Sequence, residues 1–287
     1  MRKPTFILIL LCLLTSPAMA QSEDSGDYEK FNAPWRVYLG GFSPSLRSEI
    51  SINGDEVTPP PIDVEDELGV KDSDTVPWGG IAWHISERNA LEFEWFSLNR
   101  NGSVDIVSEP IEVADLIIES GSINSVFDLT IGRLTYGWSL ARSERMDLQV
   151  KGGLHLADFS ASLQLVGAVC DVSLGEMPPG CPGAQSPPAE SDEVTAPLPH
   201  FGLSWAYAIT PNVSTTLQVI GFAIEIDGID GNLIELDADV AWQPWQNFGF
   251  GAGLRYFNVN VEGSGARLDA EFDFEYYGPV LYVQARF

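Results

Sequence analysis

Apolar and polar side chains alternate along most of this 287-residue chain, in a series of separate segments. The last segment shows the pattern most clearly, and its two sets are Pro279, Leu281, Val283, Ala285 and Phe287, and Val280, Tyr282, Gln284 and Arg286. Successive side chains of a β-strand point to opposite faces, so each segment is predicted to be a strand. No stretch after residue 20 approaches the roughly 18 consecutive apolar residues of a membrane helix. The alternation therefore predicts an all-β protein.

The connections between these segments are short turns and longer polar loops in turn. Short turns are predicted at 86–89, 142–145, 210–212 and 246–247, and longer Pro- and acid-rich loops near 53–76, 104–122 and 166–195. Outer-membrane barrels have this asymmetry, with short periplasmic turns and long extracellular loops. We therefore predict a transmembrane antiparallel up-and-down β-barrel of ten strands, over 35–52, 77–86, 90–103, 123–141, 146–165, 197–209, 213–226, 232–243, 248–262 and 268–287. Eight strands are the alternative if residues 227–243 are partly loop, and a soluble β-sandwich would not need so many aromatic residues near strand ends.

The N-terminus has the features of a cleaved secretory signal. Arg2 and Lys3 are basic, Phe6 to Leu14 form an apolar run too short to cross a bilayer, and Ala18-Met19-Ala20 is a small-x-small cleavage pattern. We predict a signal peptide at 1–20, a flexible periplasmic segment at 21–33 and a barrel over 34–287. The predicted location is the cell outer membrane.

The C-terminal strand is the most specific local motif. Residues 279–287 alternate and end on Phe287, and in this they resemble the terminal strand of Gram-negative outer-membrane barrels. More loosely, the chain looks like the small barrels of the OmpA and OmpW type. The resemblance implies that Phe287 is read by the barrel-assembly machinery and that outer-membrane lipid and lipopolysaccharide surround the chain. We expect a monomer.

The half of each strand near the short turns has one apolar and one charged face. Alternate residues of a strand lie on the same face, and we call the two alternating sets its two parities. In the first strand, Trp35 and Val37 belong to the apolar parity, which we assign to lipid. Arg36 belongs to the other parity, which we assign to the lumen. Buried charges are costly unless they are paired, so the second face predicts an ion-pair network that fills a narrow lumen. Its predicted members are Arg36, Glu92, Glu94, Arg133, Lys151, His155, Asp237, Asp239, Arg255 and Arg286. A water-filled conducting path through these charges is the alternative.

Further from the short turns, the two parities exchange their polarity without a register shift. The lumen parity becomes apolar at Phe42, Leu46, Ile50, Phe127, Leu129, Phe159, Leu163, Phe222, Ile224, Phe257, Val259, Phe272 and Phe274. The outward parity becomes polar there, as at Asp269, Glu271 and Asp273. We therefore predict that the barrel projects beyond the membrane as a collar with an apolar interior.

Two interpretations of this collar are open. The long loops could fold inward and complete a core, for example with Val113 and residues 116–118. Alternatively, the collar is a pocket for a small apolar ligand, because ligand sites are usually concave and apolar with a few polar groups. A barrel of about ten strands is wide enough to hold side chains or one small ligand.

Cys170 and Cys181 lie in the same predicted external loop. An exported chain is oxidised, so we predict a disulfide that closes this loop and stabilises it by roughly 2–3 kcal/mol. No histidine lies nearby, which argues against a metal site at these cysteines.

Motifs for catalysis are weak in this chain. His84-Ile85-Ser86 superficially resembles the His-x-Ser pairing of a lipid A deacylase, but Ser86 falls at a periplasmic turn, the wrong end for surface lipid. No cofactor and no metal are predicted.

The chain has 41 acidic and 15 basic residues, a formal net charge of −26. Phosphate binding needs a basic surface, so nucleic acid is excluded as a partner.

These observations favour an outer-membrane barrel without catalytic activity, with a charged narrow lumen and an apolar collar. Its role is predicted to be structural, or the binding and passage of small hydrophobic molecules. The alternatives are a lipid-modifying enzyme of the outer membrane and a surface adhesin that uses the acidic loops.

Overall fold

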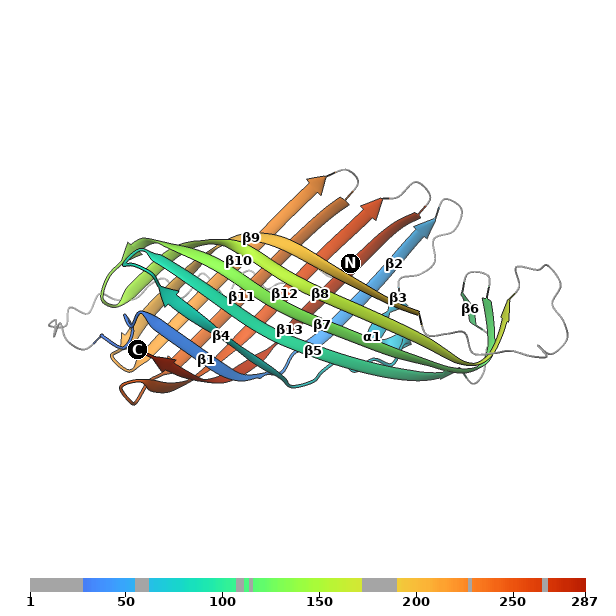
Figure 1. The fold of residues 1–287 in the computed structure, drawn as a ribbon, viewed down its shortest axis with the longest axis horizontal. Coiled ribbons are helices and arrows are strands. Elements are labelled where there is room, and N and C mark those ends of the chain that lie inside the picture. Colours follow the sequence, from blue (N-terminus) through green and yellow to red (C-terminus); the bar gives the residue numbers. More distant parts are fainter. Residues whose placement is uncertain are drawn as a thin grey trace, which may run out of the picture.

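The computed structural model describes residues 28–54, 62–106, 111–113, 116–171, 190–226, 229–264 and 268–287. Almost all of them belong to one antiparallel sheet. It closes on itself because β1 (Trp35–Phe42) pairs with β4 (Val76–His84) on one edge and with β13 (Leu268–Arg286) on the other (Figure 1). The other wall strands are β2 (Ser45–Gly54), β5 (Asn89–Ile106), β7 (Leu116–Arg142), β8 (Met146–Asp171), β9 (Glu190–Thr210), β10 (Val213–Ile226), β11 (Ile229–Trp242) and β12 (Phe248–Ser264). The predicted antiparallel barrel is confirmed.

The first wall strand is interrupted at Ser43 and Pro44, so the predicted strand 35–52 is present as β1 and β2. Both halves pair with β13, since Phe42 lies opposite Val280 and Ser45 lies opposite Tyr277. Proline has no backbone N–H to donate to a ladder, which explains the position of the break. With β1 and β2 counted as one wall strand, the barrel has the ten strands predicted, and the eight-stranded alternative is wrong.

Several strands run further beyond the membrane than the alternation predicted. β7 has 27 residues and β8 has 26, and both enter segments predicted to be loops. The three-residue β6 (Ile111–Val113) pairs with the start of β7. Only roughly 9–11 residues of a tilted strand are needed to cross a bilayer. Outside the bilayer neither face has to be apolar, so a strand continues through polar sequence wherever a neighbouring strand satisfies its backbone hydrogen bonds.

One connection folds back between the walls of the barrel. After β2 comes the two-residue β3 (Ile62–Asp63), which pairs with β2, and then the short helix α1 (Val64–Glu67). The Asp63 carboxylate caps α1 by accepting a hydrogen bond of 2.9 Å from the Asp66 N–H. In Figure 1, β3 and α1 lie between β2 and β5. We call residues 62–75 the strap.

The outer surface of the membrane-crossing part is apolar, as predicted from parity. Exposed side chains on this surface include Trp83, Phe93, Leu134, Leu203 and Phe250. The side chains that alternate with them point into the barrel, where they are mostly buried. This inside-out polarity suits a wall that has lipid on its outer side.

No helix among the described residues is long and apolar enough to cross a membrane.

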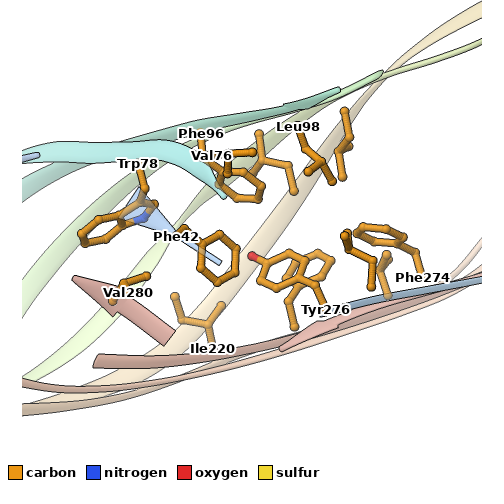
Figure 2. Packing of buried hydrophobic residues seen from close by; sticks show 14 of the residues in the cluster. Phe42, Val76, Trp78, Phe96, Leu98, Ile220, Phe274, Tyr276 and Val280 are labelled. Atoms are coloured by element: carbon orange, nitrogen blue, oxygen red, sulfur yellow. The ribbon is translucent and has the colours of Figure 1, made fainter. Parts of the chain in front are cut away.

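The apolar core lies inside the barrel, above the charged half of the lumen. Figure 2 shows Trp78 and Phe96 on one wall facing Ile220 on the opposite wall, with Phe42 between them. Side chains from opposite walls therefore meet in the middle of the barrel at this level.

Candidate functional site: a charged lumen beneath an apolar collar

An ion-pair network centred on Arg133 of β7 fills the periplasmic half of the lumen. The Arg133 side chain is 5% exposed and lies 3.0 Å from Glu94 of β5 and 3.3 Å from Asp237 of β11. It also contacts Glu235 of β11. β7 and β11 are not neighbours in the sheet. The guanidinium therefore joins opposite walls of the barrel across its lumen.

Two further cations extend the network. Lys151 Nζ lies 2.5 Å from Glu92, and Arg255 lies 3.0 Å from Asp239 and 3.4 Å from Asp237. Each of these carboxylates has a cationic partner, as the cost of burying a charge requires.

Two histidines continue the network toward β9. His155 Nε2 lies 2.9 Å from Glu235, and His155 Nδ1 lies 3.0 Å from His200 Nδ1. His200 Nε2 lies 3.1 Å from the Thr135 hydroxyl. The sequence analysis did not single out Glu235 or His200, although both have the lumen parity: Glu235 alternates with apolar Ile234 and Leu236. Parity applied to every polar residue of a strand would have found both.

Arg36 and Arg286 are the two predicted lumen cations that have no carboxylate within 4 Å among the described residues. They lie directly opposite each other on β1 and β13. The Arg36 guanidinium lies 4.6 Å from the centre of the Tyr38 ring, and Arg286 donates a hydrogen bond of 3.2 Å to the Lys30 carbonyl. All ten predicted network residues thus lie inside the barrel. Seven of the other eight take part in ion pairs, and His155 lies within hydrogen-bond distance of Glu235.

Residues 28–34, just before β1, lie across the periplasmic mouth. Lys30 Nζ donates a hydrogen bond of 2.7 Å to Asn212, and Asn32 Nδ2 donates one of 2.9 Å to the Glu144 carbonyl. The Arg145 guanidinium lies 5.2 Å from the centre of the Tyr28 ring. This segment therefore contacts two different periplasmic turns and covers the network from below.

Above the network, the predicted collar residues line the inside of the barrel. Phe42, Leu46, Phe127, Leu129, Phe257, Val259 and Phe274 are buried, and Phe159, Phe222 and Phe272 are partly buried against them. The side chains of Ile50, Leu163 and Ile224 lie outside the described part of the chain. These ten described side chains point into the barrel.

The strap fills part of the collar. Val64 and Val70 are buried in a cluster with Phe127, and Leu68 and Phe159 pack against this cluster. An inward-folding loop was one of the two expectations, but the sequence analysis looked for it at Val113 and residues 116–118. Those residues belong to β6 and β7, which pair with each other in the extension beyond the collar.

A hollow of about 560 Å³ lies at the periplasmic turns. His84 lines it, with Nε2 3.5 Å from Asp147. The Ser86 hydroxyl accepts a hydrogen bond of 2.7 Å from Asn89. Ser86 is therefore a turn residue at the short-turn end of the barrel, where the sequence analysis placed it.

Other predicted features lie partly beyond the described residues. The Cys170 backbone lies opposite Ile117 at the end of β8, but Cys181 is outside the described ranges, so the disulfide stays a prediction. The predicted signal peptide, residues 1–20, is outside them too.

Phe287 is exposed, and its N–H donates a hydrogen bond of 3.1 Å to the Trp35 carbonyl where the barrel closes. Across the described ranges there is no group of three His, Cys, Asp or Glu side chains placed to hold a metal ion.

Solved structures provide the comparison that bears on the fold. No family model matches the chain, and no curated protein matches it in sequence. The chain is similar to the outer membrane protease OmpT from Escherichia coli, with a TM-score of 0.51 and 9% sequence identity over 88% of this chain and 97% of that one. The chain has the fold of an outer-membrane β-barrel.

Two weaker similarities have TM-scores below 0.5. The barrel matches the toluene transporter TbuX of Ralstonia pickettii with a TM-score of 0.35 and 12% identity over 89% of this chain and 90% of that one. It matches the outer membrane protein OprG of Pseudomonas aeruginosa with a TM-score of 0.29 and 9% identity over 88% of this chain and 95% of that one. Neither similarity bears on the role of the barrel.

Proposed function

We propose that the barrel binds small apolar molecules in its extracellular collar, and that it neither catalyses a reaction nor conducts solutes straight through its lumen. The observation that carries this proposal is a set of inward-facing apolar side chains that the core leaves only partly buried. Phe159, Phe222, Val261 and Phe272 belong to this set.

These side chains surround the upper edge of the collar core. Phe159 and Phe272 come from different parts of the wall and meet with ring centres 5.8 Å apart, and Phe272 and Phe274 stack with ring centres 6.2 Å apart. The outward positions on the same strands are polar, as at Asp273 and Glu275, so the apolar surface is confined to the inside. A concave apolar surface with a polar surround is the usual form of a small-molecule site.

Passage straight through the barrel is opposed by two layers beneath this surface. Tyr38, Trp78 and Tyr282 pack together at the floor of the collar, and the Arg255 guanidinium lies 5.0 Å from the centre of the Trp78 ring. The Arg133 network lies below them and joins opposite walls. An apolar molecule would have to disrupt buried ion pairs to continue, and that costs several kcal/mol. The proposal is therefore binding in the collar, without straight passage.

The absence of catalysis is part of the same proposal. The His155–Glu235 pair would be the obvious acid–base candidate, but His155 is only 2% exposed and has the collar core above it. A general base has to reach a proton of the substrate. His84 and Asp147 lie at the opposite end of the barrel from the collar, so they do not serve a ligand there.

Binding can be measured with radiolabelled naphthalene as the probe, using the barrel in lipid nanodiscs and subtracting the uptake of empty nanodiscs. We expect one saturable site, and we expect Phe272→Asp to weaken binding at least about tenfold because the ligand would then desolvate a carboxylate. Val126→Asp is the matched control, because it adds the same charge at an outward position of the collar. Folding of each variant is checked by its heat-dependent shift in gel mobility. Uptake equal to that of empty nanodiscs, or equal loss in both variants, would contradict the proposal.

A further inference from the structure

The wall of the collar has a seam between β2 and β5. In the membrane-crossing part, β1 pairs with β4 and β4 pairs with β5. Above this level β4 has ended. There β2 pairs with β13 on one edge, and its other edge meets the strap through the two-residue β3 and the isolated bridge of Ser45 to Ser73. The outer half of β5 pairs with β7, and its other edge meets the strap through one isolated bridge, Val70 to Gly102. The strap therefore takes the place of a wall strand at this seam.

A single charged contact ties the strap to both sides of the seam. The Glu65 carboxylate accepts hydrogen bonds from the Ser48 N–H at 2.7 Å and the Ser48 hydroxyl at 2.9 Å, which attach it to β2. It also accepts one of 2.5 Å from Arg100 of β5, whose side chain is 3% exposed. Arg100 in turn donates to the Ser48 hydroxyl at 3.1 Å. We call Ser48, Glu65 and Arg100 the latch.

The apolar side chains of the strap share a surface with the proposed ligand site. Val64 and Val70 are buried against Phe127, and Phe159 packs against the same cluster as well as against the main collar core. The rings of Phe127 and Phe159 have centres 6.1 Å apart, and Phe159 also contacts Phe272. The strap thus covers one side of the Phe127–Phe159 surface. The partly buried phenylalanines of the proposed ligand site lie on the other side.

We propose that the strap is a displaceable stopper, and that a small apolar ligand gains its full site by replacing Val64, Leu68 and Val70 on the Phe127–Phe159 surface. This inference rests on the proposed function of the collar. The strap is suited to this role because it belongs to no long ladder. It is held by one latch, a short cluster and isolated backbone contacts, such as the hydrogen bond of 2.7 Å from the Leu46 N–H to the Asp72 carbonyl. Segments with few ladder bonds open locally at much lower cost than paired strands.

A reversible cross-link of the strap to the wall tests this proposal. Ser45 and Ser73 form an isolated antiparallel bridge between β2 and the strap. Residues in such a bridge have a Cα separation that a disulfide accepts. The Ser45→Cys, Ser73→Cys pair is made in a chain whose Cys170 and Cys181 are changed to Ser. Ser97→Cys, Thr130→Cys is the matched control, because it joins β5 to β7, which are already paired, and leaves the strap free.

The measurement is the rate at which radiolabelled naphthalene leaves protein-loaded nanodiscs, before and after addition of a reductant. We expect the oxidised Ser45–Ser73 pair to exchange the probe at least about tenfold more slowly than its reduced form, with no such difference in the control pair. Arg100→Met, which removes the cation of the latch, is expected to speed exchange by about threefold or more, which checks the proposal without any cross-link.

The outcomes separate this inference from the function on which it rests. One outcome is saturable naphthalene binding with the same exchange rate in the oxidised form, the reduced form and Arg100→Met. That result would overturn the proposal that the ligand displaces the strap, and would leave the proposed collar site intact. Failure of every form, reduced or oxidised, to bind naphthalene above empty nanodiscs would overturn both.

Discussion

At the scale of single residues, Arg133 shows how much of the barrel depends on paired charge. Its guanidinium contacts Glu94, Glu235 and Asp237, all largely removed from water. A charge in such a place is tolerated only because its partners are present, so the network behaves as one unit.

Replacement of Arg133 by Met should therefore destabilise the barrel strongly. Three carboxylates would lose a shared counter-charge, and we expect a loss of about 3–5 kcal/mol in the free energy of unfolding, measured by urea titration in detergent. Arg88→Met, at an exposed turn, is the control and should change the free energy by less than about 0.5 kcal/mol. Glu235→Gln added to Arg133→Met should recover part of the loss. Equal effects of the two arginine variants would show that the network contributes little.

At the scale of elements, the strap is fitted to its wall by backbone contact. A Cβ placed on Gly102 of β5 would lie 2.6 Å from the Leu68 carbonyl oxygen and 2.7 Å from the Val70 nitrogen, closer than real Cβ atoms come. Gly69, on the strap side of this contact, has a φ of +60°, which residues with a side chain rarely adopt. Two glycines thus allow the strap to lie directly on β5.

Gly102→Ala should lift the strap from β5 without disturbing the membrane-crossing ladder. We expect faster hydrogen exchange at residues 64–70, by about tenfold or more, because local opening becomes cheaper. Gly41→Ala is the matched control on the same side of the barrel, since its added Cβ would meet only the Thr75 methyl at 3.5 Å. Unchanged exchange in Gly102→Ala would mean that the strap is not seated on this backbone.

At the scale of the whole molecule, the barrel has three levels. The segment 28–34 covers the periplasmic mouth, the ion-pair network fills the membrane-crossing lumen, and the collar core with the strap fills the outer half. Figure 1 shows the outer ends of β5, β7 and β8 bending away from those of β2 and β13.

This arrangement predicts a barrel that does not conduct ions. In planar bilayers we expect no stepwise current from the wild-type chain, because the described side chains of the ion-pair network and of the collar core lie across the lumen. A variant that combines Arg133→Ala, Glu235→Ala and Asp237→Ala is the comparison, since it removes the centre of the network while it leaves the collar core unchanged. Steady unitary currents from the wild-type chain would contradict the sealed lumen.

Parity was enough to predict most of this barrel and part of its site. Alternation identified the wall strands and the direction of residues such as Arg133, Phe42 and Phe272, because the two faces of a strand meet different surroundings. The same rule assigns Glu235 and His200 to the lumen, because each alternates with apolar outward residues.

The strap could not be predicted in this way. Residues 62–75 have no period, and their place depends on contacts made far along the chain, such as Glu65 with Arg100 and Val70 with Gly102. Pro44 lacks the N–H that a ladder hydrogen bond needs, and this indicates a break in the strand. The alternation of side chains nevertheless continues across Pro44, so the side-chain pattern alone predicts one unbroken strand.

The contacts of residues 28–34 also bear on how the barrel is completed. Lys30 contacts Asn212 of the β9–β10 turn, Asn32 contacts Glu144 of the β7–β8 turn, and Arg286 contacts the Lys30 carbonyl, so two hairpins and the final strand must already be in position before this segment can settle. Its docking therefore comes after ring closure and reports on it. A protease confined to the periplasm would cut an unfinished chain here and spare a finished one.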